Sequence, residues 1–297
     1  MENVGATVNK VNGNQAPATG RVKAVRKKCR LLLRPLAKSI ERCRSTPDSV
    51  RNRGAWALRR ALLPYVKLPM WVASRGGAKF YLGSDPVDDL ILEDVLKHHL
   101  DLYFPAGALE GDGARLVLDI GAHHGFVVVE MLRRYPGARV IAVEPNPAAI
   151  GLLKKNLEAN NFLDRVEFVE GGVGPQDGVG FLTYGRKGSW EDTTLPAEGG
   201  GEGAGRGVQV RISTLASILG GRKPALVKCN AEGAEYYLFP QLFAMGVRPE
   251  FIILMAHPEH GSVEDLKALL REAGYGIKEV GSGPGRPRFH CCLQPRP

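Results

Sequence analysis

The chain has 297 residues, of which 44% are hydrophobic and 24% are charged, a composition typical of a soluble globular protein. It contains no run of about 18 apolar residues that would span a bilayer and no apolar signal-peptide core, so we expect a cytoplasmic protein. The net charge of +9 is concentrated at one end, because residues 1–67 hold 16 basic and 3 acidic residues while the remainder holds 24 and 28. A nucleic-acid-binding surface on the remainder is therefore not expected.

The first 67 residues contain two predicted units. Residues 1–20 are rich in Asn, Gly, Ala and Thr and are predicted to form a disordered tail. Residues 21–67 are predicted to form a basic helical extension, because apolar side chains recur in steps of three and four between Val22 and Cys43, with basic side chains opposite them. Such a helix could contact a partner protein or an anionic membrane, which would make the protein peripheral to the membrane, or it could pack on its own domain.

Residues 68–110 are predicted to form a cap segment toward the substrate, with a strand over 79–82 and an acidic helix over 88–102. Residues 111–297 then alternate short β-rich runs with helical stretches, which predicts a doubly wound, mostly parallel α/β sheet. The expected strands cover 115–120, 139–143, 166–170, 225–230 and 250–255, and the expected helices cover 125–134, 147–160, 234–245 and 263–272. Two last strands, 276–280 and 288–293, are close enough to form an antiparallel hairpin.

Residues 181–212 depart from this alternation. The glycine-rich stretch 197–207 has no core-forming side chains, and it is predicted to be a disordered insertion, with a lid over a pocket as the alternative.

A glycine-rich turn follows the first of these strands, in the sequence LDIGAHHGF at 118–126. Gly121 allows the backbone to approach a ligand closely, and Gly125 opens the next helix. Ligands of open α/β sheets bind at the carboxyl ends of such strands. We therefore predict that the turn, including Asp119, Ala122 and His123, lines a cofactor pocket.

An acidic residue ends the second strand, in RVIAVEPNP at 139–147. Glu144, followed by Pro145, can accept hydrogen bonds from both hydroxyls of a ribose, as in sites for NAD and for S-adenosyl-L-methionine. A dinucleotide requires G-x-G-x-x-G, which is missing here, and the carboxylate of Asp119 would repel phosphates. That carboxylate suits the cationic amino-acid end of S-adenosyl-L-methionine, which we predict as the cofactor.

Two further predictions concern this pocket. Adenine is expected against the loop after the third strand, near Gly172 and Val173. No metal is expected at His123 and His124, because neighbouring side chains in a turn seldom point the same way and no third ligand is near in sequence.

With these motifs, and with LVKCNAEGAEYYL at 226–238 and MAHPEH at 255–260, the sequence resembles the FkbM family of methyltransferases over roughly residues 115–280. The resemblance implies a Rossmann-like methyltransferase fold, dependence on S-adenosyl-L-methionine, and O-methylation, often of sugars or natural products. The sequence departs from the family pattern at Asn230 and Ala216, where an aspartate is usual. The first change removes a possible base or substrate anchor at the end of the fourth strand.

Methyl transfer to a hydroxyl requires positioning of the acceptor and benefits from a base. His257, which follows the fifth strand, is the first candidate because of its ordinary pKa. Asn230, Glu232 and Glu235 are the other candidates for catalysis, and Lys228 is expected to pair with a carboxylate. The predicted partner is a small-molecule or glycan acceptor.

Three other functions compete with this one. The first is an NAD-type oxidoreductase, which the missing G-x-G-x-x-G and the terminal hairpin disfavour. The second is a protein that binds S-adenosyl-L-methionine without turnover, which Asn230 and Ala216 suggest. The third is a nucleic-acid methyltransferase, which the basic extension suggests, although the remaining residues are mildly acidic.

Overall fold

The computed structural model describes residues 41, 44, 46, 48–62, 68–97, 107–109, 114–183, 207–283 and 285–295. The tail predicted at 1–20, nearly all of the amphipathic helix predicted between 22 and 43, and residues 197–206 of the glycine-rich stretch lie outside these ranges. Among the described helices, none is long and apolar enough to cross a membrane.

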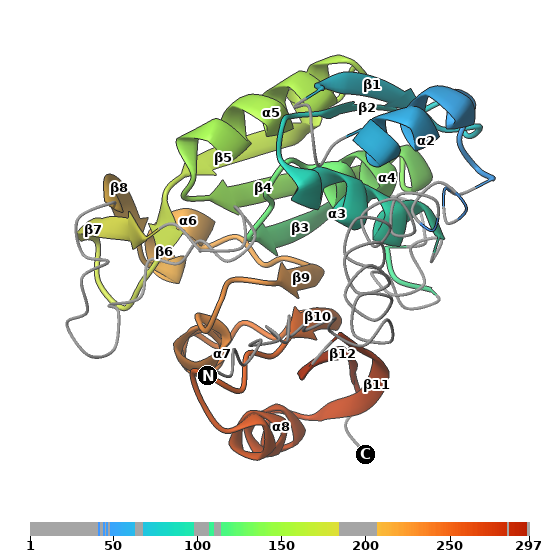
Figure 1. Ribbon diagram of the computed structural model, residues 1–297. Helices are drawn as coiled ribbons and strands as arrows, with labels where there is room; N and C mark the ends of the chain where they lie inside the picture. The colour runs from blue at the N-terminus through green and yellow to red at the C-terminus, as the bar shows by residue number, and fades with distance from the viewer. Residues whose placement is uncertain are drawn as a thin grey trace, which may run out of the picture.

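A seven-stranded sheet forms the centre of the molecule, in the order β11-β12-β10-β9-β3-β4-β5 (Figure 1). Strands β10, β9, β3, β4 and β5 are parallel, and β12 is antiparallel to both β10 and β11. The predicted doubly wound, mostly parallel sheet with a C-terminal hairpin is confirmed. The strands are β3 (Arg115–Ile120), β4 (Ala138–Glu144), β5 (Val166–Glu170), β9 (Leu226–Cys229), β10 (Phe251–Met255), β11 (Tyr275–Gly283) and β12 (Arg286–Leu293).

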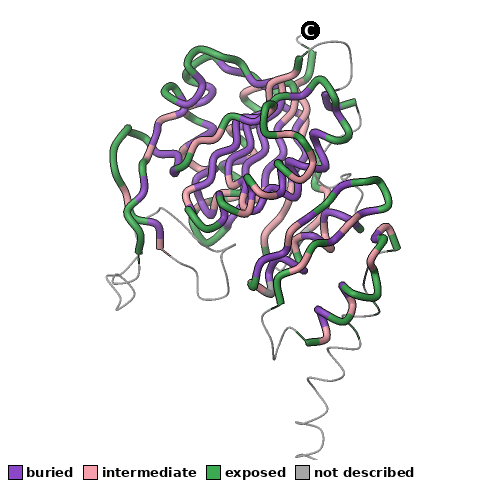
Figure 2. The backbone as a smooth tube through the Cα atoms, turned by 90° about the horizontal axis from the view of Figure 1, so that it is seen from above, coloured by how far each residue is buried: buried purple, intermediate pink, exposed green. Residues whose placement is uncertain are grey.

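Successive strand residues face two different cores, which lie on opposite faces of the sheet. Val117 and Val140 belong to one core, and their neighbours Leu118 and Ile141 belong to the other. Figure 2 shows the strands as a buried layer at the centre of the molecule. Helices α2 (Arg53–Leu62), α3 (Pro86–Lys97), α4 (Phe126–Arg134) and α5 (Pro147–Glu158) contribute to the first core, and α6 (Leu215–Leu219), α7 (Glu235–Ala244) and α8 (Val263–Glu272) contribute to the second.

The described residues of the segment predicted as a cap, 68–97 and 107–109, are packed into the first core. Its strands β1 (Met70–Ala73) and β2 (Lys79–Leu82) form an antiparallel pair, of which only the second strand was predicted. Asn156 of α5 donates to the carbonyl of His124 and accepts from the backbone of Tyr81, so it ties β2 to the turn before α4. The segment therefore forms part of the α/β domain, while its role toward a substrate stays a prediction.

A small sheet that the sequence did not predict follows β5. It consists of β6 (Gly172–Val173), β7 (Gly178–Thr183) and β8 (Gly207–Ser213), in the order β6-β8-β7. Its sequence does not mark the buried face by hydrophobicity, since Val179 and Phe181 share one face of β7 and are both exposed although apolar. A 3₁₀ turn, η1 (Leu163–Arg165), precedes β5.

Candidate functional site

The two central strands of the sheet, β3 and β9, end side by side at Gly121 and Asn230. The N–H of Asn230 donates to the carbonyl of Ile120 at 3.0 Å. Gly121 has φ +78°, and a Cβ there would lie 2.0 Å from the carbonyl oxygen of Asn230. The close approach of Asn230 therefore requires glycine at position 121, whether or not a ligand is bound there. Chain connections leave β3 and β9 toward opposite faces of the sheet, and such a switch point is where α/β sheets bind ligands.

The turn after β3 is fixed by backbone contacts. Both Gly121 and Ala122 donate their N–H groups to the carbonyl of Val143 in β4. Gly125 has φ +75° and opens α4, as predicted, and a Cβ there would lie 2.2 Å from Cδ1 of Leu153. The tight packing that this glycine permits is therefore against helix α5.

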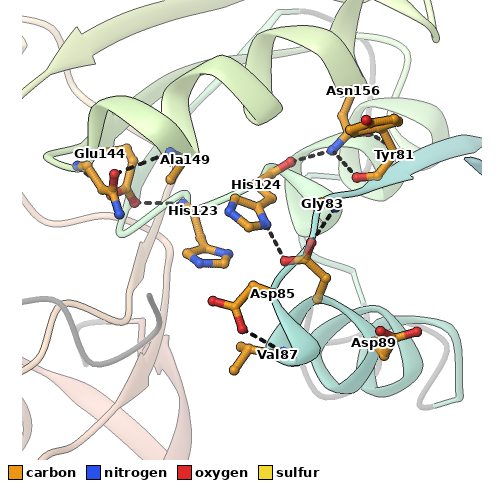
Figure 3. A network of polar contacts seen from close by, with 12 residues as sticks. Tyr81, Gly83, Asp85, Val87, Asp89, His123, His124, Glu144, Ala149 and Asn156 are labelled. Carbon is orange, nitrogen blue, oxygen red and sulfur yellow. Dashed lines mark hydrogen bonds and ion pairs between the residues drawn. The ribbon is translucent and has the colours of Figure 1, made fainter. Parts of the chain in front are cut away.

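Glu144 ends β4 with its carboxylate buried beside this turn. One oxygen accepts from the N–H of His123 at 2.8 Å (Figure 3). The other accepts from the N–H of Asn146 at 2.9 Å. Burial raises the pKa of Glu144, and the two N–H donors oppose that rise. Each oxygen keeps a lone pair that could accept a hydroxyl hydrogen bond. Pro145, the next residue, is half-buried.

Asp119 is 1% exposed and forms an ion pair with Lys228 in β9, at 2.7 Å. The pairing predicted for Lys228 is confirmed, and its ammonium also donates to the carbonyl of Gly121 at 2.7 Å. The charge of Asp119 is therefore compensated within the protein, which differs from the free anion that the sequence suggested. Its second oxygen, Oδ2, is buried without a hydrogen-bond donor among the described residues, so it remains able to accept one.

The two histidines of the turn stack on each other, with ring centroids 3.7 Å apart and an interplanar angle of 26°. The expectation that their side chains diverge was wrong, because His123 adopts φ +51° and its ring turns back over His124. Burial, and then the electrostatic interactions with His124 and Lys228, hold the pKa of His123 well below its usual range. Within the described part of the chain, no group of three metal-ligating side chains comes together.

A second polar cluster lies where β9 and β10 end. His257 has no exposed surface, with Nδ1 2.8 Å from Glu235 and Nε2 3.2 Å from Glu232. Although burial opposes it, contacts with these two carboxylates raise the pKa of His257 to about 9. The ring is therefore an imidazolium at neutral pH and has no lone pair to accept a proton. This arrangement does not favour the role of general base that we expected for His257.

Glu232 is the member of this cluster that reaches the surface, with its side chain 10% exposed. It adopts φ +44°, a conformation that costs a non-glycine residue energy and recurs at functional sites. Arg286 of β12 contacts both oxygens of Glu232 at 3.1 Å and also pairs with Glu259. Sequence reasoning missed Arg286, because only the pairing of β12 with β10 brings it to this place. Asn230, the remaining catalytic candidate, is exposed.

Gly172 and Val173 follow β5 and pair with β8. The carbonyl of Val173 accepts from the hydroxyl of Tyr237 at 2.6 Å, a contact that the sequence did not indicate. The backbone of Gly171 joins this loop to β4 by donating to the carbonyl of Glu144. The loop thus lies beside the turn and Glu144, while its recognition of adenine stays a prediction.

The contacts of His257 with Glu232 and Glu235 make the free energy of unfolding depend on pH. Its pKa is about 9 in the folded protein against an ordinary value of 6.5. The resulting stabilisation, about 3 kcal/mol, is present below pH 6.5 and is lost as the pH rises through 9. We expect urea unfolding at pH 6.5 and pH 9.5 to show this loss, and His257→Gln to flatten the dependence. Equal unfolding free energies of the unaltered protein at both pH values would contradict the stabilisation of protonated His257 by these two carboxylates.

Comparison with known proteins agrees with this geometry. Residues 119–277, more than half of the chain, match the family model described as "Methyltransferase FkbM domain". A release factor glutamine methyltransferase from Chlorobaculum tepidum is 31% identical over 101 residues, which is 32% of this chain and 34% of that protein. The methyltransferase sdnD from Sordaria araneosa is 33% identical over 82 residues, 28% of this chain and 32% of that protein. The chain thus spans about a third of the length of these curated relatives.

Solved structures of methyltransferases superpose loosely on the chain. An O-methyltransferase family protein from Burkholderia thailandensis aligns with a TM-score of 0.40 and 13% identity, over 82% of this chain and 60% of that one. Aeropyrum pernix fibrillarin, solved with S-adenosyl-L-methionine, aligns with a TM-score of 0.40 and 11% identity, over 66% of this chain and 73% of that one. Because these superpositions are loose, the fold is identified by the strand order of the central sheet itself.

Proposed function

The chain belongs to the FkbM methyltransferase domain family, and on that premise we propose that it transfers the methyl group of S-adenosyl-L-methionine to a hydroxyl oxygen of a sugar or small molecule. The observation that carries the proposal is the buried carboxylate of Glu144. Two backbone N–H groups fix its orientation beside the Gly121 turn, at the switch point of the sheet. A carboxylate so placed suits the two hydroxyls of a ribose.

The residues around the turn fit the proposed cofactor. Glu144 would hold the ribose, and Oδ2 of Asp119 offers a buried acceptor for the ammonium of the amino-acid end. The uncharged imidazole of His123 and the small side chain of Ala122 would line the space between them. The chemistry supplied by bound S-adenosyl-L-methionine is an electrophilic methyl group on a sulfonium.

The protein must then hold the acceptor oxygen in line with that methyl group and receive its proton. We assign the second task to Glu232, because its side chain is 10% exposed while those of Glu235 and His257 have no exposed surface, and His257 and Arg286 hold it in place. Bound S-adenosyl-L-methionine would supply the methyl group and leave as S-adenosylhomocysteine when its methyl–sulfur bond breaks, while the carboxylate of Glu232 would take the hydroxyl proton of the acceptor. Glu235 positions His257, and the exposed amide of Asn230 can donate to or accept from the acceptor.

Ligand binding tests the proposal against its main rival. We expect isothermal titration calorimetry to detect S-adenosylhomocysteine and not NAD, and Glu144→Ala to weaken the binding of S-adenosylhomocysteine by about 30-fold, the value of hydrogen bonds to a charged group. Glu170→Ala, which removes an exposed carboxylate at the end of the neighbouring strand β5, provides the matched control and should bind normally. The proposal would be falsified if NAD bound and S-adenosylhomocysteine did not.

Asn230 favours a second candidate, a protein that binds the cofactor without turnover. It stands where the family usually has a carboxylate, and it lies at the switch point against Gly121. Incubation with labelled S-adenosyl-L-methionine and a panel of glycans and small hydroxylated molecules separates the two functions. Label transfer that disappears in Glu232→Gln supports the methyltransferase, whereas tight binding with no transfer to any acceptor supports the second candidate.

A further inference from the structure

We propose that Asp88, which precedes the family-matched region, is a positioning residue that fixes the ribose-binding carboxylate of Glu144 by acting through His124 and His123. The proposal rests on the proposed function, because it takes Glu144 as the group that holds the ribose. Through Asp88, residues 68–97 would contribute to the affinity for the cofactor, in addition to packing in the hydrophobic core.

Asp88 lies near the start of helix α3 and has no exposed surface. Its Oδ1 is 2.6 Å from Nδ1 of His124, and its Oδ2 accepts from the N–H of Gly83 at 2.5 Å. The carboxylate therefore joins three parts of the chain: the end of β2, helix α3 and the turn after β3. A polar contact this short between buried atoms holds the His124 ring in one orientation relative to helix α3.

Two further contacts connect His124 to Glu144. The ring of His124 stacks on that of His123, and His123 keeps the left-handed φ of +51°. This backbone conformation directs the N–H of His123 to Oε2 of Glu144 (Figure 3). A histidine in this conformation is strained, so the surrounding contacts must hold it. The 2.6 Å contact of Asp88 with the ring of His124 is one such contact, and the hydrogen bond from Asn156 to the carbonyl of His124 is another.

The next residue along the helix provides a matched control. Asp89 is also a buried carboxylate, but it pairs with Arg59 and accepts from the indole of Trp56 in helix α2. It lies apart from the two histidines in Figure 3. Asp88→Asn and Asp89→Asn therefore remove equal charges from adjacent positions of one helix, and only the first change touches the cofactor turn.

The test compares two ligands, S-adenosylhomocysteine and its 2′,3′-dideoxy counterpart, by calorimetry on the full chain. We expect the unaltered protein to prefer the hydroxylated ligand by about 30-fold, the value of hydrogen bonds to a charged group. In Asp88→Asn this preference should fall to about threefold, because Glu144 is no longer held in place. In Asp89→Asn the preference should stay unchanged, even though the variant unfolds at a lower temperature. If Asp88 only stabilises the fold, Asp88→Asn would weaken the binding of both ligands equally and leave the ratio of their dissociation constants unchanged.

Each result decides the proposal. An unchanged preference in folded Asp88→Asn overturns the inference and leaves the proposed function intact. If the unaltered protein does not bind S-adenosylhomocysteine, the proposed function and the inference both fall. If Asp88→Asn does not fold, His124→Asn removes the same contact from its other partner, and an unchanged preference there overturns the inference equally.

Discussion

Replacing Gly121 by alanine is expected to lower the free energy of unfolding by roughly 4 kcal/mol, through left-handed strain and overlap with a backbone atom. The φ of +78° is unfavourable for any residue with a Cβ, and the new Cβ would lie 2.0 Å from the carbonyl oxygen of Asn230. A backbone carbonyl in the centre of the sheet cannot turn aside as a long side chain can. Strand β9 would have to separate from β3 at the switch point, so we also expect loss of cofactor binding.

Gly77 offers a control that separates the two causes. It has φ +92°, and a Cβ there would meet nothing within 4 Å. Gly77→Ala should therefore cost only the left-handed strain, roughly 1 kcal/mol, and should bind S-adenosylhomocysteine normally. Urea unfolding of both variants gives the comparison. Equal losses of stability would show that the contact between Gly121 and Asn230 is not as tight as the structure has it.

The sequence was sufficient for the central sheet because each strand has local signals. The run at 115–120 ends in a glycine turn, and Asn146 with Pro147 marks the start of α5, where the Asn146 side chain caps the helix. The small sheet β6-β8-β7 has no such signals. Its pairing joins Gly172 to Ile212 across a long stretch of chain, and only the tertiary structure specifies that register.

The same distinction applies to the site. The positions of Gly121 and Glu144 at the carboxyl ends of β3 and β4 were predictable from local motifs, while their roles toward a cofactor stay predictions. Asp88 and Arg286 were not predictable, since each comes from a separate element and reaches the site through packing. The role of His257 depends on its surroundings in the same way. Its ordinary pKa suggests a base, but two buried carboxylates turn it into a fixed cation.

The largest effect on catalysis is expected from Glu232→Gln, which keeps the shape of the side chain and removes its basicity. Loss of a general base typically costs 10²- to 10⁴-fold, so kcat should fall by about 100-fold or more, while the dissociation constant of S-adenosylhomocysteine stays within about twofold. Glu259→Gln is the control, because Glu259 pairs with the same Arg286 but its side chain is 41% exposed, against 10% for Glu232. Its kcat should stay within about twofold of that of the unaltered protein, in an assay of labelled methyl transfer.

The dependence of kcat on pH then separates Glu232 from His257 as the base. If Glu232 receives the proton and the imidazolium of His257 holds it in place, kcat is level near neutral pH and falls as the pH rises through about 9, where the imidazolium loses its proton. If neutral His257 receives the proton, kcat rises tenfold per pH unit up to about 9. The two slopes have opposite signs, so a single profile decides between the residues. A rising profile that persists in Glu232→Gln would return the role of base to His257.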